Sequence, residues 1–150
     1  IYLLGAQQHV IDQLRHVLLQ RNPSLIIAGS RNGYFTDEEH HDVVSDVKRS
    51  GADLLFIGMP SPFKEVFAAD HLDEFGADLV MGVGGSFDVI SGFVPRAPSM
   101  LQRTGFEWAW RLACEPRRMW KRYAVTNAWV ARQLVTRMVR RRRRRPDPSS

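Results

Sequence analysis

Residues 79–123 decide the expected fold, and they read LVMGVGGSFDVISGFVPRAPSMLQRTGFEWAWRLACEPRRMWKRY. An apolar run at 79–83 predicts a buried strand, which breaks at Gly84-Gly85 and is followed by Ser86, a residue typical of helix N-termini. Adjacent glycines let a backbone approach a ligand closely, and the N–H groups of a starting helix attract anions. The turn therefore indicates either a phosphate site or a strand-to-helix turn that needs glycine for backbone reasons alone.

Upstream of this stretch, short apolar runs alternate with helical patterns. The expected order is a strand at 2–4, a helix around 10–18, a strand at 25–28, a helix after the Thr36–Glu39 capping box, a strand at 53–57, a helix at 63–75 and a strand at 79–83. Strands that alternate with helices predict an α/β fold, a Rossmann-like, open and mostly parallel sheet flanked by helices. Ligands of such sheets bind at the carboxyl ends of the strands.

The net charge of +5 hides an uneven distribution. From residue 111 onward, thirteen Lys and Arg residues stand against two acidic residues, a balance of +11. The preceding residues carry eight Lys and Arg against fourteen acids, a balance of −6. An acidic body with a basic end favours an anionic partner for that end, namely anionic lipid, a nucleotide diphosphate or nucleic acid.

The basic end has the pattern of a long amphipathic helix of about 30 residues, or about 45 Å, beginning at Glu115-Pro116. One face carries Val130, Ala131, Leu134, Val135, Met138 and Val139, and the other carries Arg132, Arg137 and Arg140. This pattern favours a helix lying in the interface of an anionic membrane, too short and too charged to span it. The alternative is a helix packed on the domain with a solvated basic face. We accordingly divide the chain into a domain at 1–110, a basic helical appendage at 111–145 and a disordered tail at 146–150.

Several motifs, in this order, carry a resemblance to a known family: YLLG (2–5), NGYF (32–35), GADLLFIGMPSPFKE (51–65), GVGGSFDVISG (82–92), RAP (96–98), GFEWAWRL (105–112) and EPRRMWKRY (115–123). Together they resemble the WecG/TagA/CpsF glycosyltransferase family, glycosyltransferase family 26. The resemblance implies an inverting transferase without a metal or other cofactor. Its members move a hexose or N-acetylhexosamine, such as N-acetylmannosamine, from a UDP-sugar to a polyprenyl-diphosphate-linked sugar. It also implies bacterial cell-surface polysaccharide or teichoic acid biosynthesis and a peripheral location on the cytoplasmic face of the inner membrane.

The resemblance also implies where the donor binds. The expected UDP-sugar site comprises Tyr34, Gly58, Ser61, Pro62, Lys64, Glu65, Gly84, Gly85, Ser86 and Asp88. Tyr34 or Phe87 would stack on the base, and Asp88 would accept a hydrogen bond from ribose or uracil. The alternative is that the two rings only pack in the protein and that the Asp88 carboxylate only places a negative charge at a helix N-terminus. The family pattern resembles G-x-G-S-P-K-Q-E, and Lys64 stands in place of its Gln. The identity of the donor sugar is therefore left open.

The same resemblance assigns Arg117, Arg118 and Arg122 to the diphosphate leaving group, with contact to lipid headgroups as the alternative. For the membrane we expect Val130, Leu134, Val135, Met138, Arg137 and Arg140 to make contact. The family's carboxylate base is expected upstream of Ile1, so we expect this chain to bind nucleotide but to turn over poorly. A homo-oligomer is left open.

Two other classes of function compete with a transferase: a nucleic-acid-binding module and a non-catalytic module that docks at the membrane. Nucleic-acid binding is disfavoured because the basic residues are concentrated at one end instead of being spread over a surface with exposed aromatics. His40-His41 predict a solvated helix face, since adjacent side chains on a helix point about 100° apart and cannot share one metal ion. Cys114, flanked by apolar residues, predicts a packed side chain.

Overall fold

The computed structural model describes residues 1–114 and 116. They belong to two compact units, Ile1–Arg96 (unit 1) and a second that begins at Ala97 (unit 2). Unit 2 thus starts before the boundary that we expected at residue 111, and the functional division of the chain stays a prediction.

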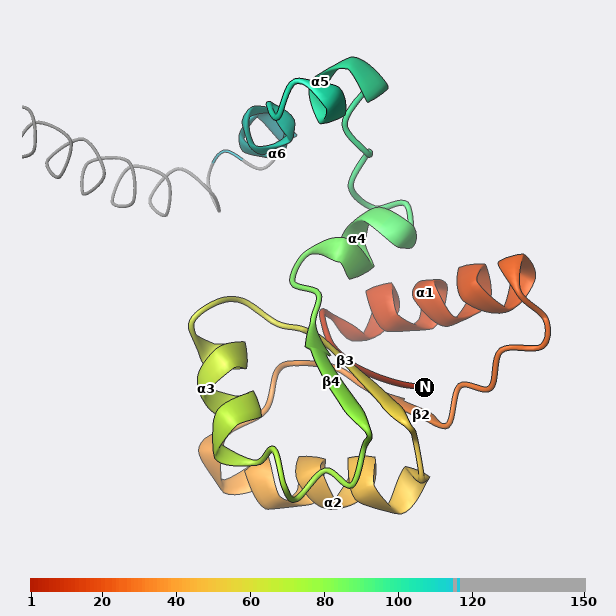
Figure 1. The fold of residues 1–150 in the computed structure, drawn as a ribbon, viewed down its shortest axis with the longest axis vertical. Coiled ribbons are helices and arrows are strands. Elements are labelled where there is room, and N and C mark those ends of the chain that lie inside the picture. Colours follow the sequence, from red (N-terminus) through yellow and green to blue (C-terminus); the bar gives the residue numbers. More distant parts are fainter. Residues whose placement is uncertain (115, 117–150) are drawn as a thin grey trace, which may run out of the picture. The chain divides into compact units, whose positions relative to one another are not determined.

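Unit 1 contains a four-stranded sheet with the order β2-β1-β3-β4. The strands are β1 (Tyr2–Gly5), β2 (Gly29–Arg31), β3 (Leu54–Gly58) and β4 (Leu79–Gly82). All neighbouring strands are parallel. The predicted α/β, Rossmann-like sheet flanked by helices is therefore confirmed (Figure 1).

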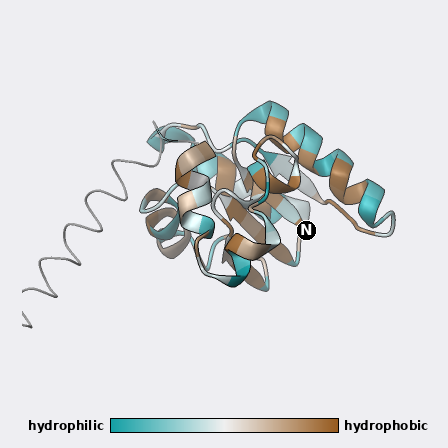
Figure 2. Cartoon of the chain, turned by 90° about the horizontal axis from the view of Figure 1, so that it is seen from above, coloured by the Kyte–Doolittle hydropathy of each residue, from teal (hydrophilic) through white to brown (hydrophobic). Residues whose placement is uncertain are grey.

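The helices of unit 1 cover both faces of the sheet, so the core has two halves. They are α1 (Gln8–Arg21), the short 3-10 helix η1 (Asp37–Glu39), α2 (His40–Ser50), α3 (Phe63–Asp70) and α4 (Ser86–Ile90). One half of the core joins Leu3 of β1 to residues of α1 and to Phe87 of α4, and the other joins Leu4 and Leu55 to α2 and α3. Apolar residues thus lie along the strands and the inner helix faces, while polar residues of α1 face outward (Figure 2).

Two element boundaries differ from the prediction. The apolar run at 25–28 is not the second strand, because β2 follows it at Gly29–Arg31 and pairs there with Tyr2–Leu4. β2 is an edge strand whose residues are all only half-buried, so it carries no apolar signal. Helix α3 ends at Asp70 instead of residue 75, and the chain then forms turns up to Gly76, which has a φ of 68°.

The segment η1–α2 begins directly after Thr36, where the sequence predicts a helix start. The Thr36 backbone N–H donates to Oε2 of Glu39 at 2.8 Å, which confirms the capping box. Arg31 at the end of β2 reaches Glu39 at 3.2 Å and Asp46 of α2 at 2.9 Å. These ion pairs hold a strand that has few apolar contacts against the helix layer.

The expectation of a solvated histidine pair is wrong for His40. Its ring lies within an aromatic cluster, with centroids 5.0 Å from Phe67, 5.6 Å from Phe35 and 5.8 Å from His71. Of the pair His40-His41, only His41 is exposed. The apolar residues of α3 pack against the first turn of α2, so His40 is covered by an element that the local helix pattern could not reveal.

The described part of unit 2 consists of α5 (Ser99–Arg103) and α6 (Glu107–Cys114). The two are joined closely, since the Phe106 N–H donates to the Leu101 carbonyl at 3.0 Å. Cys114 is exposed, so the expectation that it packs is wrong. The long helix expected from Glu115 lies outside the described residues. Among the residues that the structure describes, no helix is long and apolar enough to cross a membrane.

Candidate functional site

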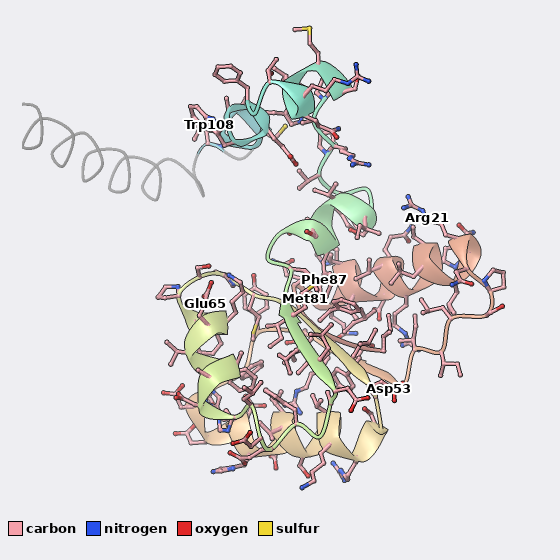
Figure 3. All side chains as sticks on the ribbon, in the orientation of Figure 1. Arg21, Asp53, Glu65, Met81, Phe87 and Trp108 are labelled. Carbon is pink, nitrogen blue, oxygen red and sulfur yellow. The ribbon has the colours of Figure 1, made fainter. Side chains whose placement is uncertain are left out.

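The strand order places a topological switch point between β1 and β3. From β1 the chain moves to β2 on one side, and it returns to place β3 on the other side of β1. In open parallel sheets, ligands bind outside the carboxyl ends of the strands at such a point. The four loops that follow the carboxyl ends of the strands, the strand exits, are therefore the candidate site. Glu65 and Phe87 lie at this end of the sheet, opposite to Asp53 (Figure 3).

Backbone hydrogen bonds join three of the exits. The Ala6 N–H donates to the Gly58 carbonyl at 3.1 Å, and the Gly33 N–H donates to the Ala6 carbonyl at 3.0 Å. Gly5 has a φ of 133°, and a Cβ there would lie 2.5 Å from the Gly58 carbonyl carbon. Only glycine fits that position, so the exits of β1, β2 and β3 form one compact floor.

Our sequence reasoning missed the exit of β1 as part of this edge. The available signal was Gly5, which follows an apolar strand directly, as Gly58 and Gly84 do. The other three exits, which carry Tyr34, Gly58–Glu65 and Gly84–Asp88, lie at the edge that we predicted.

The exit of β3 carries a polar network of three side chains. The Ser61 hydroxyl donates to Oε1 of Glu65 at 2.7 Å, and the Lys64 ammonium donates to both of these partners. The aliphatic stem of Lys64 lies against β4, because a Cβ on Gly82 would meet Lys64 Cε at 2.9 Å. Lys64 thereby connects the β3 exit to the last residue of β4.

Hydrogen bonds from Lys64 and Ser61 lower the pKa of Glu65 to about 2. Glu65 is thus a carboxylate throughout the neutral range, and it offsets the charge of Lys64. An anionic ligand at this loop would have to share the Lys64 ammonium with Glu65. A neutral, hydroxyl-rich ligand would find two acceptors and a donor, which suits a sugar.

The exit of β4 is less open to a phosphate than we expected. The Gly84 N–H donates to the Ile57 carbonyl at 3.3 Å, and the Ser86 N–H donates to the Val83 carbonyl at 3.2 Å. Helix α4 has only 5 residues. Two of the N–H groups considered for binding an anion already donate to backbone carbonyls. An anion at this edge would therefore depend more on positively charged side chains.

The two aromatic residues considered for base stacking have different surroundings. Phe87 is 3% exposed, and its ring lies so close to Gly58 that a Cβ there would be 2.3 Å from Phe87 Cδ2. Phe87 therefore packs in the core. Tyr34 is 72% exposed, and its backbone N–H donates to Oδ1 of Asn32 at 3.1 Å. Of the two rings, only that of Tyr34 is open to solvent.

Asp88 lies in the first turn of α4 and is half-buried. Its carbonyl accepts hydrogen bonds from the Val94 N–H at 3.0 Å and from the Ser91 hydroxyl at 3.1 Å. Both expected roles of its carboxylate, ligand contact and charge at a helix N-terminus, remain predictions.

A separate cavity of about 180 Å³ lies between α1, the sheet and α4. Its lining is almost entirely apolar and consists of Ile1, Leu3, Leu14, Leu18, Phe56, Val83, Ser86, Phe87 and Ile90. Ser86 and Phe87 belong to this lining and were also considered for the donor site. An apolar cavity without charged groups does not suit a nucleotide, so the strand exits remain the candidate site.

Several predicted site residues lie outside the described residues. They are Arg117, Arg118 and Arg122 for the diphosphate and Val130, Leu134, Val135, Arg137, Met138 and Arg140 for the membrane. Within residues 1–114 and 116, no group of three or more His, Cys, Asp or Glu side chains is arranged to hold a metal ion.

Comparison with protein families identifies the family to which the chain is similar. The model of the glycosyl transferase WecG/TagA/CpsF family matches residues 1–144. The matched region includes all four strand exits, the α5–α6 segment and the arginines that follow it. The resemblance that the motifs suggested is therefore confirmed.

Proposed function

The chain belongs to the WecG/TagA/CpsF glycosyltransferase family, whose members act in cell-surface polysaccharide biosynthesis, and from that premise we propose its donor, acceptor and site. The protein transfers a hexose or an N-acetylhexosamine, such as N-acetylmannosamine, from a UDP-sugar to a polyprenyl-diphosphate-linked sugar with inversion. The reaction takes place at the cytoplasmic face of the bacterial inner membrane. The observation that supports this most strongly is the switch point at the strand exits, combined with a family match that covers it.

The donor lies across the four strand exits. Tyr34 stacks on the uracil ring, since it is the most exposed of the aromatic side chains near this edge. Ser61, Lys64 and Glu65 face the donor sugar, and their network supplies donors and acceptors for its hydroxyl groups. Gly58 and Pro62 shape the loop beneath it, and the segment Gly84–Asp88 lies beside the ribose and the phosphates.

The reaction breaks the bond between the anomeric carbon and the diphosphate, while the acceptor hydroxyl gives up its proton to a general base and its oxygen forms the new glycosidic bond. Negative charge builds up on the departing UDP, so cations placed there lower the barrier. Arg117, Arg118 and Arg122 fill this role, because a guanidinium binds phosphate oxygens in a bidentate manner. In this proposal the arginines have the role that a divalent metal has in other enzymes, and the reaction uses neither metal nor cofactor.

Titration calorimetry with UDP and UMP at low salt tests this proposal. Arg117→Ala combined with Arg118→Ala is expected to weaken UDP binding roughly ten- to a hundredfold, since a hydrogen bond to a charged group is worth about 1.5–3 kcal/mol. UMP, which lacks the second phosphate, is expected to lose much less. The matched control is Arg15→Ala combined with Arg21→Ala, which removes the same charge from exposed positions on α1.

Equal losses in the two arginine pairs would show a general charge effect and contradict the assignment. A wild-type chain without measurable UDP affinity would contradict the donor site itself. Chelation of divalent ions by EDTA is expected to leave the UDP affinity unchanged. Nucleic-acid binding, the competing function, predicts a gel shift at physiological salt in place of UDP binding.

A further inference from the structure

Three rings join two of the strand exits. The ring centroid of His40 lies 5.6 Å from that of Phe35 and 5.9 Å from that of Phe63, and the centroids of Phe35 and Phe63 are 6.0 Å apart. Rings at such separations are in contact and favour a fixed mutual arrangement. We call these three side chains the ring triangle. Each of its members therefore restricts the positions of the other two.

The ring triangle connects parts of the candidate site that are far apart in sequence. Phe35 directly follows Tyr34 in the exit of β2. Phe63 is the first residue of α3 and directly precedes Lys64. His40 begins α2, a helix that covers the same face of the sheet as α3 but contains none of the residues expected at the donor site (Figure 1). A displacement of the His40 ring would thus reach both the loop expected to hold the base and the loop expected to face the sugar.

The position of the His40 ring is itself fixed. Arg31 of β2 forms ion pairs with Glu39, the residue before His40, at 3.2 Å and with Asp46 of α2 at 2.9 Å. The His40 ring centroid also lies 5.0 Å from that of Phe67, which is 2% exposed. Helix α2 is thus held against the sheet, and its first residue places a ring next to a residue of each exit.

The surroundings of this ring favour packing over hydrogen bonding. Nε2 of His40 is buried and has no hydrogen-bond partner among the described residues, although Oδ1 of Asp37 lies 3.4 Å away. Buried polar atoms are usually hydrogen-bonded, so this nitrogen is not what holds the ring in place. A phenylalanine at this position would keep a flat ring in the same space without the buried nitrogen.

We propose that His40 is a positioning residue for the donor. Its ring holds Phe35 and Phe63 at the spacing at which Tyr34 and Lys64 bind the two ends of one UDP-sugar. This rests on the proposed function, because it requires the donor to lie across these exits. Without the ring, the two loops move independently, and a ligand that spans both must order them at the cost of affinity.

Titration calorimetry with UDP-N-acetylmannosamine and with UDP tests this role. His40→Ala is expected to weaken binding of the UDP-sugar about tenfold and of UDP by less than about threefold, because UDP lacks the sugar that reaches Lys64. His40→Phe restores a ring and is expected to bind both ligands within about twofold of the wild type. The matched control is Val47→Ala, which removes a buried side chain of α2 about two turns further on and is expected to leave both affinities unchanged.

A double-mutant cycle measures the coupling between the two loops. In the wild type, the losses of UDP-sugar affinity in Tyr34→Ala and Lys64→Gln are expected to be non-additive by about fivefold, since both groups bind one ligand in a fixed arrangement. In the His40→Ala background the two losses are expected to add within about twofold. Each cycle is measured within one background, so a general loss of stability does not change the result.

The outcomes separate this inference from the proposed function. Equal losses for UDP and the UDP-sugar in His40→Ala, or equal losses in His40→Ala and Val47→Ala, overturn the positioning role and leave the donor site intact. A wild-type chain that binds neither ligand overturns the donor site and the positioning role together. Urea unfolding checks that each variant is folded. If His40→Ala is unfolded, His40→Leu, which fills most of the space without a ring, takes its place with the same expected difference between the ligands.

Discussion

Unit 1 and the described part of unit 2 differ in where their apolar side chains lie. Unit 1 buries residues on both faces of its sheet, including Leu4, Ile11 and Phe67, which are almost inaccessible to water. In unit 2, Met100 and Phe106 are more than half exposed. The comparison teaches that unit 1 is stabilised by its own core, whereas no side chain described for α5 and α6 is fully buried.

Truncating one phenylalanine in each unit is expected to give the largest difference. Phe67→Ala removes a buried ring of α3 that packs in the aromatic cluster, so we expect a loss of about 3–5 kcal/mol in the free energy of unfolding. Phe106→Ala removes an exposed ring and is expected to change it by about 0.5 kcal/mol or less. Urea unfolding at constant m-value measures both, and similar losses would contradict the contrast.

A smaller effect is expected at the floor of the candidate site. Gly58→Ala would place a methyl group against the Phe87 ring, so we expect a loss of about 1–3 kcal/mol. The same substitution in a Phe87→Leu background is expected to be less destabilising, because leucine leaves more space. A double-mutant cycle by urea unfolding gives the coupling. Additive losses would mean that the Gly58–Phe87 contact does not set the position of the β4 exit.

The smallest effect concerns the polar network at the β3 exit. Lys64→Gln removes the main hydrogen bond to Glu65, so we expect the pKa of Glu65 to rise from about 2 toward its ordinary value of about 4.3. Because the folded pKa is the lower one, the network stabilises the folded protein above about pH 4.3 and loses this effect as the pH falls toward 2.

Carbon-13 NMR of the Glu65 side chain follows this titration. Lys48→Gln, which removes the same charge from an exposed position on α2, is the control and is expected to leave the pKa of Glu65 unchanged. A pKa of Glu65 that stays near 2 in Lys64→Gln would show that Ser61 alone holds the carboxylate.

The fold could be predicted from the sequence because three of its four strands are apolar runs. The strand β4 is nevertheless not the buried strand that its sequence predicts, because it lies at the edge of the sheet with Leu79 and Met81 exposed. The runs at 2–4, 53–57 and 79–83 coincide with β1, β3 and β4 to within one residue. The strand β2 could not be found in this way, since an edge strand of Gly-Ser-Arg carries no apolar pattern and the neighbouring run at 25–28 does. The half-buried position of His40 likewise depends on contacts with α3 that lie far from it in sequence.

The candidate site could be predicted in outline because glycines follow the strands directly. Gly58 and Gly84 pointed to the correct edge of the sheet, and the family motifs named the polar residues around them. Phe87 could not be assigned from the sequence, because stacking and packing require the same kind of ring. Its position against Gly58 is a product of tertiary packing, and so are the acceptors that already occupy the Gly84 and Ser86 N–H groups.

Backbone amide NMR during a titration with UDP tests the central claim most directly. We predict that the shifted signals gather at the four strand exits, around Ala6, Tyr34, Ser61 and Gly85, while those of Asp53 and Gly76 at the opposite end of the strands stay unchanged. Shifts confined to the opposite end of the sheet, or to the apolar cavity beneath α4, would contradict the assignment of the donor site.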